Sequence, residues 1–128
     1  MNKYEVFTHI RDLVNDLDVL ITEGKRAILT KDLNGFLLFV NGLKRVFENA
    51  SWILVEAREV TLLGNKEDKL VKYISTYYRM ITLISLPYIV SMLRESRDLL
   101  EKQGYINEVR DVDILIDRAE DILGTLRH

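Results

Sequence analysis

The sequence predicts an all-α fold: an antiparallel up-down-up-down four-helix bundle with long helices, the third kinked at Pro87. Three observations support this prediction. Apolar residues recur in alternating steps of three and four, which is the period of one helix face. Turn-forming residues are scarce, with six Gly and one Pro. The apolar stripes are joined by short connections, which favour antiparallel neighbours.

The first predicted helix runs from about Lys3 to Leu29. Charged residues such as Arg11, Asp18 and Lys25 lie opposite its apolar stripe, as expected for a helix that buries one face. That stripe consists of Phe7, Ile10, Val14, Leu17, Ile21, Gly24 and Ile28, with Val6, Leu13, Leu20 and Ala27 beside it.

The second predicted helix begins after Asp32, whose carboxylate can accept hydrogen bonds from free backbone amides. It ends at Gly64, a residue suited to the left-handed region. Gly35 and Gly42 each weaken a helix interior by about 1 kcal/mol relative to Ala, so a closely packed neighbour is expected there. The stripe consists of Phe36, Val40, Leu43, Phe47, Ala50, Leu54 and Ala57.

The third predicted helix has Asn65 as its cap and ends near Gln103, at Gly104. Pro87 lies inside it and removes one backbone donor, which predicts the kink. Its stripe consists of Leu70, Ile74, Tyr77, Ile81, Ile84 and Tyr88. Asn107 is the expected cap of the fourth helix, with the stripe Val109, Val112, Ile116, Ala119, Leu123 and Leu126.

Composition predicts one domain over residues 1–128, because 48% of the residues are hydrophobic, 30% are charged and no linker separates two parts. The chain has no Cys, which excludes disulfides and thiolate chemistry and fits a cytoplasmic location. Its single glutamine, Gln103, together with the many charged residues, suits a thermophilic source. A net charge of −2 without a basic stripe makes nucleic-acid binding an unfavoured function.

The segment from Met80 to Leu93 contains no charged residue. As a helix it would be about 21 Å long, which is shorter than the ~30 Å hydrocarbon core of a membrane. The segment is therefore predicted to be a buried or interface helix, and the protein is not expected to span a membrane.

No catalytic, cofactor or metal-binding residue is predicted. His9 and His128 are the two histidines, and neither forms the Glu-x-x-His pair of a di-iron bundle. Magnesium-dependent all-α pyrophosphatases use Glu-x-x-Glu and Glu-x-x-Asp pairs on facing helices. Here these spacings occur at Glu56 and Glu59 and at Glu95 and Asp98, but the hairpin register places them about 30 Å apart.

The second and third helices carry apolar residues away from their stripes. A hairpin turning at Asn65 places Leu38 level with Met92 and Trp52 level with Tyr78, so these residues are expected to form one exposed patch. A patch of this kind marks a partner surface, most simply that of a two-fold homodimer. The predicted interaction residues are Leu38, Trp52, Leu86, Ile89, Val90 and Leu93.

Two alternatives remain open for these residues. Pro87 can rotate the stripe so that Leu86, Ile89 and Leu93 belong to the core, or an apolar ligand pocket can lie between the two helices near the kink. The sequence thus predicts a non-catalytic bundle that acts through protein–protein contacts, as a self-associating structural, assembly or adaptor subunit. The alternative function is a small-molecule-binding or metal-dependent nucleotide-hydrolysing protein that uses an interhelical pocket.

Overall fold

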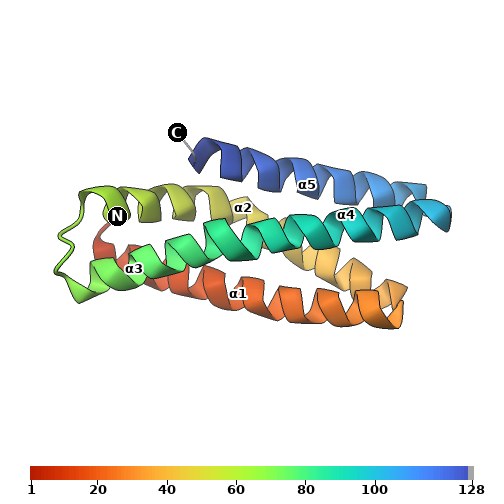
Figure 1. Ribbon diagram of the computed structural model, residues 1–128, viewed down its shortest axis with the longest axis horizontal. Helices are drawn as coiled ribbons and strands as arrows, with labels where there is room; N and C mark the ends of the chain where they lie inside the picture. The colour runs from red at the N-terminus through yellow and green to blue at the C-terminus, as the bar shows by residue number, and fades with distance from the viewer. Residues whose placement is uncertain (127–128) are drawn as a thin grey trace.

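A computed structural model describes residues 1–126 of the chain, and within them all regular structure is helical (Figure 1). The helices are α1 (Lys3–Thr30), α2 (Leu33–Leu63), α3 (Lys69–Met80), the π-helical segment η1 (Ile81–Ser85), α4 (Leu86–Lys102) and α5 (Ile106–Leu126). Because α3, η1 and α4 follow one another without a break, they form a single element, the α3–α4 rod. The prediction of an all-α fold with four long helical elements is confirmed. His128 lies outside the described residues.

α1 and α2 form a tightly packed hairpin. A Cβ atom built on Gly24 would lie 2.6 Å from Cδ1 of Phe39, and one built on Gly42 would overlap the side chain of Leu20. Residues late in α1 therefore meet residues early in α2, so the two helices run in opposite directions, as Figure 1 shows. The close neighbour expected at Gly42 is present, and it explains a glycine inside a helix.

An ion pair and a hydrogen bond link α5 to α2. Lys44 Nζ lies 3.2 Å from Asp111 Oδ2, and Arg58 donates a 3.2 Å hydrogen bond to the carbonyl of Thr125. α5 contacts α2 and α4 and ends well before the far end of the bundle (Figure 1). That end is consequently built from α1, α2 and α3.

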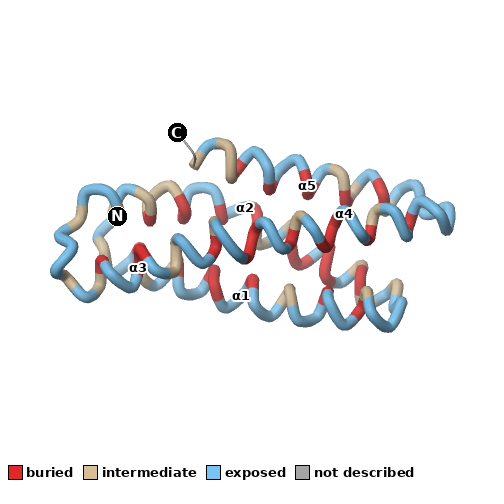
Figure 2. The backbone as a smooth tube through the Cα atoms, viewed as in Figure 1, coloured by how far each residue is buried: buried red, intermediate tan, exposed pale blue. Residues whose placement is uncertain are grey.

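The core follows the facing sides of the four elements (Figure 2). The largest fully buried side chains come from every element of the bundle. Burial of such side chains is the main driving force for folding, at about 1.5–3 kcal/mol for each large apolar residue. They include Phe39, Ile10, Leu17, Leu43, Leu54, Ile74, Ile81, Leu86, Ile89, Leu93 and Leu115.

The helix ends agree with the sequence at some positions and correct it at others. Asp32 caps α2 as predicted and accepts a 3.1 Å hydrogen bond from the N–H of Gly35. Gly64 ends α2 with φ −74°, so the prediction of a left-handed residue there is wrong. Gly104, with φ 82°, does adopt that conformation after α4. Asn107 is not a cap, because α5 already begins at Ile106.

Asp68, and not Asn65, caps α3. Its Oδ1 accepts a 2.8 Å hydrogen bond from the N–H of Leu70, whereas Asn65 accepts one from the N–H of Glu67 within the preceding turn. Asp68 also pairs with Lys3, which ties the start of α1 to the start of α3. The hydrogen bond with Lys3, and then the one from Leu70, lowers the pKa of the Asp68 carboxyl.

The π-helical segment lies immediately before Pro87. The N–H of Leu86 donates to the carbonyl of Ile81, five residues earlier, where an α-helix would use the residue four earlier. A proline lacks an N–H group, and its ring collides with the carbonyl four residues before it in a regular α-helix. The wider turn is a known way to relieve this collision. The kink itself remains a prediction.

Candidate interaction surface

Leu86, Ile89 and Leu93 are completely buried within the single chain, at 0% exposure each. The prediction that they lie on an exposed patch is therefore wrong, and the alternative in which the stripe rotates at Pro87 is correct for these three residues. They belong to the core cluster shared by all the helices. Val90 is partly buried and packs against the same core.

These residues are buried because the buried face of the α3–α4 rod shifts by one residue at the π-helical turn. Ile74 and Ile81 are buried, and the heptad spacing would continue them to Tyr88. Because the π-helical turn holds an extra residue, the buried position moves on to Ile89, and Tyr88 becomes exposed. The same shift places Ser85 inside and Ile84 outside.

Leu38 and Trp52 are exposed, as predicted, but they do not join the surface of the α3–α4 rod. Leu38 is 69% exposed on α2. Trp52 lies against α1, with its ring centroid 5.1 Å from that of His9, and donates a 3.1 Å hydrogen bond to Asn49. The rod contacts a different side of α1, where Phe7 meets Tyr77 at 6.1 Å between ring centroids. The single patch expected from both helices is therefore not formed.

The exposed apolar residues of the rod form a different surface, centred on η1. Leu83 is 72% exposed and Ile84 is 65% exposed. Met80, Pro87 and Tyr88 are exposed on the neighbouring turns, and no charged residue occurs between Arg79 and Arg94. We call these five residues, Met80, Leu83, Ile84, Pro87 and Tyr88, the η1 surface.

Comparison with known proteins assigns no family. No protein-family model, curated protein or solved structure matches this chain. The η1 surface is therefore interpreted from its own residues and their surroundings.

Charged residues border the η1 surface, and they differ between the two halves of the rod. On α4, Arg97 Nε lies 2.7 Å from Asp113 Oδ1 and its Nη1 lies 2.8 Å from Glu101, while Arg94 pairs with Glu120. The hydrogen bond to Asp113 raises the pKa of the Arg97 guanidinium. The pairs with Asp113 and Glu120 link α4 to α5, whereas the pair with Glu101 lies within α4.

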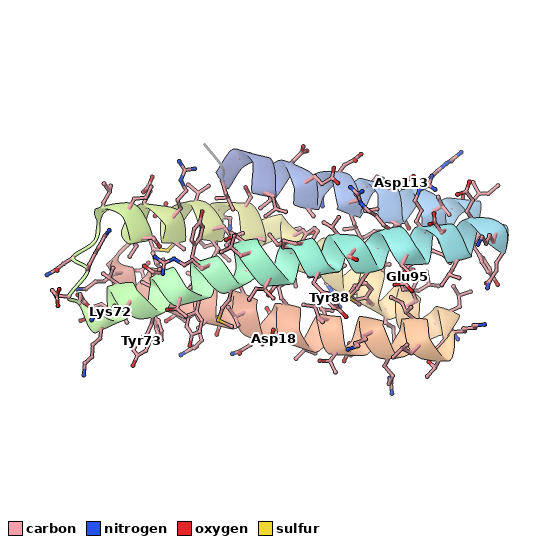
Figure 3. The ribbon with its side chains drawn as sticks, in the orientation of Figure 1. Asp18, Lys72, Tyr73, Tyr88, Glu95 and Asp113 are labelled. Carbon is pink, nitrogen blue, oxygen red and sulfur yellow. The ribbon has the colours of Figure 1, made fainter. Side chains whose placement is uncertain are left out.

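The remaining charges of the rod have no ion pair within the described part of the chain. In α3 these charges are all basic, at Lys69, Lys72 and Arg79. In α4 they are the acidic Glu95 and Asp98, followed by the basic Lys102 at the last residue of the helix. Figure 3 shows Lys72 and Glu95 towards opposite ends of the rod, with Tyr88 between them. The unpaired charges nearest to the η1 surface are thus basic on its α3 side and acidic on its α4 side.

Sequence reasoning missed Met80, Ile84, Pro87 and Tyr88 as surface residues. The spacing assigns Ile84 and Tyr88 to the core stripe, because an unbroken helix from Ile74 would bury them. The signal that could have found them is the second stripe Leu86, Ile89, Leu93, Ser96 and Leu100, which keeps helical spacing but is out of phase with the first.

The hollow between α2 and α3 does not match the apolar ligand pocket that the sequence leaves open as an alternative. The hollow between α2 and α3 is polar and cationic, with a lining of Thr61, Lys66, Val71, Lys72, Ser75, Thr76 and Arg79. It differs from the apolar pocket considered near Pro87. Among residues 1–126, no three His, Asp or Glu side chains are grouped closely enough to hold a metal ion. Over the same residues, no helix has both the length and the apolarity needed to cross a membrane.

Proposed function

We propose that this chain is a non-catalytic helical-bundle protein that acts through protein–protein contacts, and that it associates with itself through the η1 surface. The observation that supports this proposal is the exposure of Leu83 and Ile84 at the centre of an uncharged stretch of the rod. Large apolar side chains that are grouped and exposed are typical of partner surfaces, whereas isolated ones such as Leu38 are common on any protein.

The arrangement of side chains also resembles that of an interface. The centre of a protein interface is apolar and depleted of charge, and its rim is polar. The η1 surface has this order along the rod, since free charges begin only at Arg79 on one side and at Glu95 on the other. Covering Met80, Leu83, Ile84 and Tyr88 would contribute roughly 1.5–3 kcal/mol for each side chain, before the cost of association is subtracted.

Self-association is expected to be visible as mass. The chain has a mass of 15.0 kDa, so sedimentation equilibrium at micromolar concentrations should give a weight-average mass that rises with concentration towards twice that value. A mass that stays at 15.0 kDa up to the highest soluble concentration would contradict self-association.

A further inference from the structure

The exposed residues of the rod are arranged symmetrically about the point between Leu83 and Ile84. Between Lys69 and Asp98, every exposed position before this point has an exposed position at the same separation after it. The symmetry follows from regular α-helix on both sides of a central π-helical turn. The exposed residues therefore have the same spacing from Ile84 towards Asp98 as from Leu83 back towards Lys69.

The charges that occupy these positions are complementary. Lys72 and Glu95 lie equally far from the central point, and so do Lys69 and Asp98. None of these four side chains has an ion pair within residues 1–126. Lys69 and Lys72 on α3 thus each correspond to a carboxylate without an ion pair on α4.

The positions closer to the centre are also complementary. Tyr73 corresponds to Arg94, and Arg79 corresponds to Tyr88, and an arginine over a tyrosine ring is a favourable pair. At the centre the pairs are apolar: Met80 with Pro87, and Leu83 with Ile84. No corresponding pair brings two like charges together.

We propose that the partner at the η1 surface is a second copy of this chain, packed antiparallel about a two-fold axis that passes between Leu83 and Ile84. This inference rests on the proposed function. A two-fold interface joins the same patch on both subunits, so the patch has to be complementary to itself. In this arrangement Lys72 of each copy faces Glu95 of the other, and the two η1 surfaces cover each other.

The charges oppose a parallel arrangement of the same two surfaces. There each residue would lie beside its own copy, so Lys72 would face Lys72 and Glu95 would face Glu95. Like charges placed opposite each other disfavour an association, and matched charges favour it. In the antiparallel register, the basic residues of α3 in each copy attract the acidic residues of α4 in the other, so both ends of the contact are favourable.

Charge reversal in two separate variants tests this register. The Lys69→Glu/Lys72→Glu variant and the Glu95→Lys/Asp98→Lys variant each turn four attractive pairs of the dimer into repulsive ones. Exposed pairs are individually weak, but four together should raise the dissociation constant roughly tenfold or more at low salt. When the two variants are mixed in equal amounts, the glutamates introduced in one variant face the lysines introduced in the other. A heterodimer should therefore form as tightly as the wild-type homodimer.

The measurement is native mass spectrometry combined with sedimentation at low ionic strength, after circular dichroism has shown that both variants are folded. Arg110→Glu/Arg118→Glu, on the exposed side of α5, changes the net charge by the same amount as the α3 variant and should leave self-association unchanged. The antiparallel register would be overturned if both variants dimerised as tightly as the wild type, or if the two variants formed no heterodimer on mixing. Either result would leave self-association itself intact. A wild-type chain that is always monomeric would overturn both proposals.

Cross-linking gives a second test that does not depend on charge, because the chain has no cysteine of its own. Thr76 and Ser91 correspond across the proposed axis, and both are exposed. A mixture of Thr76→Cys and Ser91→Cys chains should form a disulfide-linked heterodimer under mild oxidation, since the bond needs Cα atoms closer than about 7 Å. Thr76→Cys alone should not link to itself, and faster linking of that variant alone than of the mixture would overturn the register.

Discussion

Replacing Leu93 by alanine is expected to lower the free energy of unfolding by about 2–5 kcal/mol. Leu93 is 0% exposed, so the substitution removes buried apolar contacts and leaves a cavity. Leu83 lies ten residues earlier on the same rod and is 72% exposed. Replacing it by alanine should change the free energy of unfolding by no more than about 0.5 kcal/mol. Urea denaturation of both variants below the concentration at which the chain associates measures the difference.

The glutamate variant at position 93 makes the same distinction more sharply. If Leu93 lay on the exposed patch that the sequence predicts, Leu93→Glu would be a folded monomer. With Leu93 in the core, Leu93→Glu should instead lose most of its helical signal, because a buried charge has no partner there. Equal stability losses for Leu83→Ala and Leu93→Ala would show that the buried face does not shift at η1.

Introducing two charges at the centre of the η1 surface should abolish self-association. In the Leu83→Glu/Ile84→Glu variant, four carboxylates would meet in what is proposed to be an apolar contact. An unpaired buried charge commonly costs about 3–5 kcal/mol, so the dissociation constant is expected to rise at least about 100-fold. Sedimentation velocity across a concentration series measures this change, and circular dichroism should show that the helices are retained.

Leu38→Glu is the matched control for that experiment. It is the same type of substitution at a site with similar exposure, on α2, away from the rod. Its self-association should equal that of the wild type. If Leu38→Glu dissociates the complex and the η1 double variant does not, the interface lies on α2, as the sequence alone predicted for that residue.

Much of the fold could be predicted because helical period is a local property. The apolar stripe of the first helix and the cap at Asp32 follow directly from spacing and side-chain chemistry. The same reasoning located the close contact at Gly42, where an added Cβ atom would overlap the present position of the Leu20 side chain. These features depend on residues within a few turns of one another or on a simple hairpin.

The turn between α2 and α3 was harder to predict because two residues there can act as a cap. Asn65 and Asp68 have similar capping preferences. The structure selects Asp68, which also pairs with Lys3 from the start of α1. That contact joins residues that are far apart in sequence, and no local pattern reveals it.

The candidate surface was predicted wrongly for a comparable reason. Two apolar stripes that are out of phase with each other meet near Pro87, and spacing alone does not say where one replaces the other. An unbroken α-helix keeps Ile84 and Tyr88 inside, whereas a π-helical turn before the proline exposes them and buries Leu86 and Ile89. The choice depends on how the widened turn packs against the rest of the bundle.

Thiol labelling of single-cysteine variants can show which residues of the rod are buried in the chain and which become covered on association, because the chain has no cysteine of its own. We expect a maleimide to react quickly with Leu38→Cys at every protein concentration and very slowly with Leu93→Cys. We expect Leu83→Cys to react quickly in dilute solution and to become protected as the concentration rises. Labelling of Leu83→Cys that is equally fast at all concentrations, or labelling of Leu93→Cys as fast as that of Leu38→Cys, would contradict these expectations.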